Sequence, residues 1–133
     1  MREDATQVAE RCVQASDDGT MTFPAVVGLL VEAGFERYHT DLVRHEKTFY
    51  PADGPSVRVS TAVLGGEVGR AFSAAGVEAA VRATQAGQIS YATFCERIAA
   101  AGCVAYEVSM VGRRVVYWGR TGESHTEYFP GAR

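Results

Sequence analysis

The sequence lacks the features that tie a chain to a membrane or to nucleic acid. No apolar run approaches the roughly 20 residues that a membrane-spanning helix needs, and the amino-terminal stretch MREDATQVAERC is too polar for a signal peptide. A formal charge of −3 provides no basic surface for a polynucleotide. We therefore expect a cytoplasmic protein that binds neither nucleic acid nor a membrane.

Cysteine is scarce as well. The three cysteines, Cys12, Cys95 and Cys103, cannot all pair with one another, and no Cys-x-x-Cys spacing indicates a zinc site. Phosphate-binding glycine loops, heptads and low-complexity tracts are also missing. Because free cysteine is among the most commonly buried residues, we expect the three thiols to act as small hydrophobic side chains.

The chain has the size and composition of one globular domain, with 133 residues of which 47% are hydrophobic and 22% charged. It also contains an internal repeat. Residues 22–54 match residues 90–122 in layout at a constant offset (90 − 22 = 68). Matched pairs include Gly34 with Gly102, Tyr38 with Tyr106, Tyr50 with Trp118 and Gly54 with Gly122. We predict a single domain over residues 1–133, with copy one at about 5–60, a linker at about 61–72 and copy two at about 73–129.

Each copy reads as two helices followed by a three-stranded meander. Asp4 and Thr22 are placed to cap the first two helices, and Gly34 and Gly102 stand where a left-handed residue would end a helix. After each of these glycines the pattern alternates, as it does in strands. The predicted fold class is α+β, an internally duplicated ααβββ unit with four helices packed on antiparallel sheet.

The strand registers follow from the turns. Two-residue turns at residues 44–45 and 112–113 would pair His39 with Tyr50 and Glu107 with Trp118. Third strands are expected near residues 56–60 and 124–129. If a two-residue turn precedes the last strand, His125 and Glu127 share a face with Trp118, whereas a bulge would move both to the opposite face.

Alternation separates a core face from a polar face. The residues expected to face the helices are Tyr38, Leu42, Tyr106, Val108 and Met110, and those expected on the other face are Arg37, His39, Asp41, Glu107 and Ser109.

Three residues of the polar face are candidate catalytic groups. His39, Asp41 and Glu107 combine an imidazole with two carboxylates, which could bind a divalent metal ion or perform general acid and base chemistry. A solvated sheet face gives the same pattern, and Glu107 could simply pair with Arg120 across the hairpin. No serine stands in a nucleophile motif. The sequence assigns no cofactor and no dedicated metal ligands.

Aromatic residues on the same face are candidates for binding. Tyr50 and Trp118 occupy equivalent positions in the two copies, and an uncovered pair of this kind marks a binding surface or a dimer interface. Arg120 and His125 are placed beside them as further ligand- or partner-binding candidates. The alternative is that another part of the chain covers the aromatic pair.

Two stretches carry a family resemblance: RYHTDLVRHEKTFY at residues 37–50 and AAGCVAYEVSMVGRRVVYWGRTGESHTEYFP at residues 100–130. They resemble the YbcV-like family of small bacterial and prophage proteins, some of which carry the label phage envelope protein. The family has no established function, so the resemblance implies no catalytic or ligand residues for this chain.

The functional hypothesis is an intracellular binding module that uses the aromatic and polar sheet face for a small molecule or a partner protein. One alternative is a small hydrolytic or metal-assisted enzyme centred on His39, Asp41 and Glu107. Another is a structural phage-derived component, which the family label suggests. A homodimer is compatible with the binding hypothesis.

Overall fold

The computed structural model describes residues 4–131 and contains the same order of elements in each half of the chain. The first half comprises α1 (Ala5–Asp18), α2 (Phe23–Glu32), β1 (Phe35–Asp41), β2 (Glu46–Pro51) and β3 (Val57–Ser60). The second half comprises α3 (Ala74–Gln85), α4 (Tyr91–Ala100), β4 (Cys103–Ser109), β5 (Arg114–Gly119) and β6 (Ser124–Tyr128). The starts of α2, β1 and β2 lie one repeat offset before those of α4, β4 and β5 (91 − 23, 103 − 35 and 114 − 46, each 68). Descent from one duplicated unit stays a prediction of the sequence.

Local signals set the helix ends, as predicted. The Asp4 carboxylate accepts the Gln7 N–H at 2.8 Å, and the Gln7 side chain accepts the Asp4 N–H at 3.0 Å, which forms a capping box. Thr22 caps α2 through the Ala25 N–H at 3.4 Å. Gly34 and Gly102 leave the helices with φ of 95° and 91°, a conformation that strongly favours glycine.

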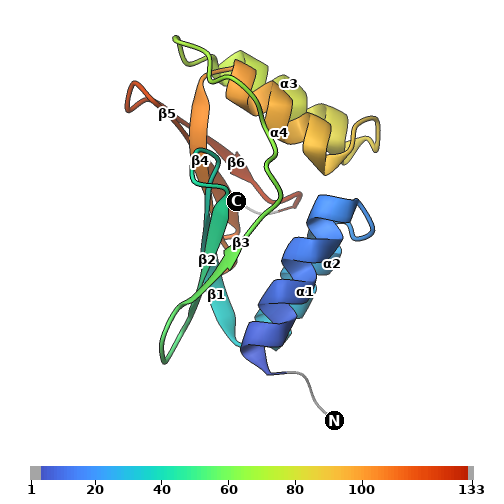
Figure 1. Cartoon of the computed structure of the whole chain (residues 1–133). Helices are drawn as coiled ribbons and strands as arrows, with labels where there is room; N and C mark the ends of the chain where they lie inside the picture. The colour runs from blue at the N-terminus through green and yellow to red at the C-terminus, as the bar shows by residue number, and fades with distance from the viewer. Residues whose placement is uncertain (1–3, 132–133) are drawn as a thin grey trace.

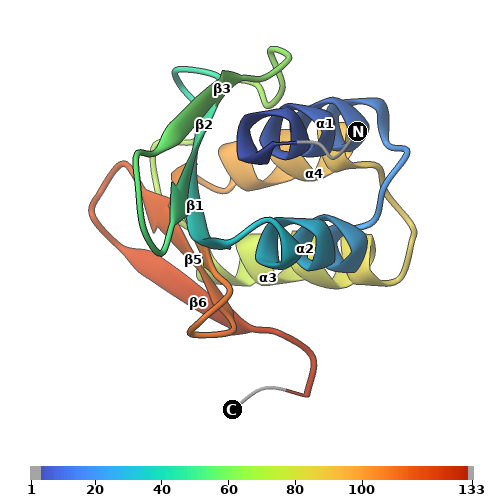
Figure 2. The ribbon, with the colours of Figure 1, turned by 90° about the horizontal axis from the view of Figure 1, so that it is seen from below.

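The strands form one antiparallel six-stranded sheet in the order β3-β2-β1-β4-β5-β6, so the two half-sheets join through β1 and β4. All four helices lie on one face of the sheet, with α1 and α2 over the first half and α3 and α4 over the second (Figures 1 and 2). The buried side chains form a hydrophobic core between this face and the helices. The α+β fold class is therefore confirmed.

The predicted division of faces is also confirmed. Tyr38 and Tyr106 are 2% and 4% exposed, and Leu42, Val108 and Met110 are buried beside them. The three cysteines are free and buried, as expected of thiols that pack as apolar groups. Lys47 lies on the same face of β2 as Phe49 and is buried there, with 3% exposure.

The predicted registers of the two long hairpins are wrong by two residues. His39 lies opposite Thr48 and Glu107 lies opposite Val116, so the loops span residues 42–45 and 110–113. The cause is side-chain bonding inside the loops, because Asp41 accepts the N–H groups of Val43 and Arg44, each at 2.9 Å. In the second hairpin, the Ser109 hydroxyl accepts the Gly112 N–H at 2.8 Å. A shift of two residues keeps every side chain on its predicted face.

The last strand takes the second of the two predicted registers. His125 lies opposite Tyr117 and Glu127 opposite Val115, and both of these β5 residues are buried. The Gly119 N–H donates to the Glu123 carbonyl at 2.8 Å, which closes a wider loop than a two-residue turn. This displacement by one residue turns His125 and Glu127 toward α3, on the face opposite Trp118.

The segment between the halves is packed rather than free. The Gly69 N–H donates to the Ala99 carbonyl at 2.9 Å, and the Ser73 N–H donates to that of Ala101 at 2.8 Å. A Cβ added at Gly102 would overlap the Ala71 carbonyl oxygen. Within residues 4–131, no helix has the length and apolar character needed to cross a membrane.

Candidate functional site

Five predicted polar-face residues gather on the side of the sheet opposite the helices, and we call them the outer-face cluster: Arg37, His39, Tyr50, Glu107 and Trp118. Strand alternation places them there, and the β1 and β4 pairing sets His39 directly opposite Glu107. The Glu107 carboxylate lies between two partners. Its Oε1 is 3.3 Å from His39 Nδ1, and its Oε2 is 3.5 Å from Arg37 Nη1.

Aromatic rings extend the outer-face cluster on both sides. The Arg37 guanidinium carbon lies 3.8 Å from the centroid of the Tyr50 ring, within cation–π range. The His39 and Trp118 ring centroids are 6.4 Å apart. The side chains of Arg37, His39 and Glu107 are 41%, 35% and 28% exposed, so water screens the contacts among them. Such pairs contribute only about 0–1 kcal/mol to stability, and their main effect is to hold the groups in place.

Of the three predicted catalytic residues, the structure brings two into contact. His39 and Glu107 meet, whereas the Asp41 carboxylate accepts the two backbone N–H groups of its turn. The alternative pairing of Glu107 with Arg120 is not observed, since Glu107 contacts Arg37 and His39. Arg120 is exposed beyond the end of β5, and its N–H donates to the Gly102 carbonyl at 3.3 Å.

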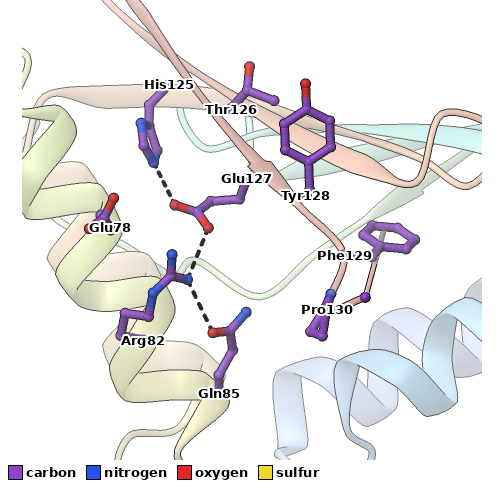
Figure 3. Close-up of a pocket in the computed structure, with 10 residues that line it drawn as sticks. Glu78, Arg82, Gln85, His125, Thr126, Glu127, Tyr128, Phe129 and Pro130 are labelled. Carbon is purple, nitrogen blue, oxygen red and sulfur yellow. Dashed lines mark hydrogen bonds and ion pairs between the residues drawn. The ribbon is translucent and has the colours of Figure 1, made fainter. Parts of the chain in front are cut away.

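A second site lies on the helix side, in a groove of about 410 Å³ between α3 and β6 (Figure 3). Glu127 is at its centre with a side chain only 10% exposed. Its Oε2 is 2.6 Å from His125 Nε2, and its Oε1 is 3.0 Å from Arg82 Nη1. Glu78 and Gln85 line the same groove from α3. We call this set of five residues the α3–β6 groove.

His125 is the one predicted binding residue that belongs to the α3–β6 groove. The sequence shows that Glu78 and Arg82 share a helix face, being four residues apart, and that His125 and Glu127 share a strand face. It does not show that the two pairs meet, because that depends on the register of β6. The counterparts of His125 and Glu127 in the first half are Val57 and Val59 (125 − 68 and 127 − 68), so the groove is specific to the second half.

The buried ionisable groups of the core are of a different kind. Burial raises the pKa of Cys95 and that of Cys103 to about 11, which leaves both thiols protonated at neutral pH. Burial also lowers the pKa of Lys47 to about 8. The hydroxyl oxygens of Tyr91 and Tyr106 lie 2.6 Å apart nearby in the core. Cys95, Cys103, Lys47 and Tyr106 are buried in the fold, and Tyr91 is partly buried beside them.

The fold and the two sites define a class of α+β protein in which the helices cover one face of an antiparallel sheet. The other face is polar and aromatic, and a charged groove lies at the edge strand β6. Residues 57–127, which are 71 of the 133, match the family described as protein of unknown function DUF1398, and the chain belongs to that family. A search of the curated proteins found no match to it.

Proposed function

We propose that this protein is a binding module and that the outer-face cluster is its contact surface for a partner protein. One observation carries the proposal: Trp118, Tyr50 and Arg37 are gathered on the sheet face opposite the hydrophobic core. The four helices all lie on the other side of the sheet (Figure 2). Tryptophan, tyrosine and arginine are the residues most enriched at binding hot spots.

The order already present in the outer-face cluster supports the proposal. Arg37 is held between the Tyr50 ring and the Glu107 carboxylate, and His39 is held between Glu107 and Trp118. Side chains that are ordered before binding lose less conformational freedom when a partner docks. A small planar ligand would use the same residues, and a second copy of the chain is one possible protein partner.

Trp118 provides the test, because it is the only tryptophan in the chain. The tagged chain captures candidates from an extract of the source organism, and each purified candidate is then titrated while Trp118 emission is recorded. We expect a change in emission when a partner binds the unaltered chain. Calorimetry, which does not need the tryptophan, should give affinities at least about tenfold weaker in Trp118→Ala and Arg37→Ala, as for hot-spot residues. Phe23→Ala is the matched control, since Phe23 is a 41% exposed aromatic residue on α2.

Two outcomes would contradict the proposal. One is a partner whose affinity is the same for Trp118→Ala and the unaltered chain. The other is loss of cooperative unfolding in Trp118→Ala, which would assign the indole to packing. Sedimentation of the chain alone, compared with Trp118→Ala, decides whether the partner is a second copy.

The alternative proposal is a small hydrolytic or metal-assisted enzyme. The 3.3 Å contact of His39 with Glu107 favours it, because a carboxylate that orients an imidazole is a common arrangement in general base catalysis. It requires turnover of an ester, amide or phosphoester substrate that is lost in His39→Ala and kept in His45→Ala. A structural phage-derived role rests on the YbcV-like resemblance alone, and it predicts higher-order assembly by light scattering.

A further inference from the structure

The α3–β6 groove contains a set of metal-ligand atoms that the proposed function does not use. A carboxylate oxygen of Glu78, a ring nitrogen of His125 and a carboxylate oxygen of Glu127 all lie within 4.8 Å of one another. From these three side chains, we propose that the groove binds a divalent transition-metal ion, Zn²⁺ being the best match. This inference is independent of the outer-face cluster, which lies on the opposite face of the sheet.

The donor set selects the class of ion. Zinc binds both imidazole nitrogen and carboxylate oxygen, whereas calcium and magnesium prefer oxygen ligands alone. With Glu78 and Glu127 ionised and Arg82 charged, the groove carries one net negative charge when His125 is neutral. That charge favours a cation over an anionic ligand.

Only small movements are needed to seat the ion. Ligands about 2.0–2.2 Å from a tetrahedral zinc ion lie roughly 3.3–3.6 Å from one another. His125 Nε2 and Glu127 Oε2 are now 2.6 Å apart and would separate slightly, with the metal replacing the proton between them. Glu78 is exposed on α3, so its side chain is free of the packing that would resist movement into the site.

The surroundings also resemble those of a metal site. Arg82 holds the other oxygen, Oε1, of Glu127 at 3.0 Å and reaches Gln85 at 3.2 Å, so Oε2 stays directed toward His125 (Figure 3). Outer-shell partners of this kind orient carboxylate ligands. Three protein ligands leave the fourth position of a tetrahedral ion open to the groove for water or a small ligand.

The experiment measures Zn²⁺ binding to the full chain by calorimetry, with Co²⁺ absorption as a second readout. We expect saturable binding of one ion per chain and an affinity at least about tenfold weaker in Glu78→Gln, which leaves the contacts of Glu127 with Arg82 and His125 in place. Glu10→Gln is the matched control, because Glu10 is exposed on α1 at the position equivalent to Glu78 (78 − 68). His125→Ala should abolish binding, whereas His45→Ala should not.

Three results would overturn the proposal. The first is the absence of saturable binding, and the second is equal affinity in Glu78→Gln and Glu10→Gln. The third is loss of binding in His39→Ala with retention in His125→Ala, which would place the metal on the outer face. Because Glu78 is exposed, the comparison of the two Gln variants stays valid even if changes at the buried Glu127 prevent folding.

Discussion

Lys47 is the only lysine in the chain, and its burial leads to a quantitative prediction about pH and stability. Its Nζ lies 4.7 Å from the centroid of the Tyr91 ring and 5.6 Å from that of the Tyr38 ring. Burial lowers the pKa of Lys47 from 10.5 to about 8, against a smaller opposing contribution from Cys95. The amine is therefore easier to deprotonate in the folded protein than in the unfolded chain.

The sign of the effect follows from proton binding. Between pH 8 and 10.5 the unfolded chain binds more protons at Lys47 than the folded protein, so this contribution to stability rises with pH. Below pH 8 the amine is charged in both states. The folded protein is then less stable, by about 3 kcal/mol, than it would be with a neutral Lys47, since each pKa unit corresponds to about 1.36 kcal/mol. Cys95 acts in the opposite direction, because its raised pKa lowers stability as pH rises from 9 to about 11.

The substitution Lys47→Met isolates the lysine together with its attraction to the Cys95 thiolate, because the other cysteine and tyrosine contributions are shared by both proteins. Methionine keeps the unbranched shape without the charge. At pH 7 we expect Lys47→Met to be more stable by about 1–3 kcal/mol, which is the burial penalty less a cation–π contribution of about 0.5–2 kcal/mol. At pH 10 that advantage should shrink by about 2 kcal/mol.

The assay is urea unfolding followed by circular dichroism at both pH values. Selective ¹³C labelling of lysine adds a direct check, because the single side-chain signal should titrate with a midpoint near pH 8. A midpoint near 10.5, or a stability difference that is equal at pH 7 and pH 10, would refute the reasoning.

Further predictions concern backbone and thiols. Gly102→Ala should lower the melting temperature, because φ is 91° and the new Cβ would overlap the backbone of the linker, at a cost of at least about 1–2 kcal/mol. Gly28→Ala, at an exposed α2 position with open space around it, should instead raise stability by about 0.5–1 kcal/mol. Cys95 and Cys103, 1% and 0% exposed, should resist Ellman's reagent in the folded protein and react fully in guanidinium; fast reaction of either thiol in buffer would contradict their packing role.

Much of the fold was predictable because its signals are local. Asp4 and Thr22 cap their helices with bonds to residues three positions away, and Gly34 and Gly102 end theirs with a backbone angle that other residues avoid. The face of each strand residue follows from alternation, which survives a register error of two residues. For that reason the sequence placed His39 and Glu107 on one face even though it paired each with the wrong partner.

The registers themselves were not predictable from turn residues alone. Strand alternation predicts Asp41 and Ser109 on the polar face, but their side chains bond the loop backbone and lengthen both hairpins. The loop before β6 is one residue longer than the two-residue turn. A register shift by an odd number of residues moves every side chain of the strand to the other face of the sheet. The sequence therefore predicts His125 as a binding residue but does not predict its neighbours in the groove, Glu78 and Arg82.

By itself the sequence determined the ten elements found within residues 4–131, their caps, the two faces of the sheet and the burial of the cysteines, since each depends on residues a few positions apart. Only the tertiary structure decided which side chains meet: Glu107 with Arg37 and His39, Glu127 with His125 and Arg82, and Lys47 with the tyrosine rings. These contacts join residues far apart in the chain, and their partners are selected by strand register and helix docking, which minimise the free energy of the whole fold rather than of any one segment.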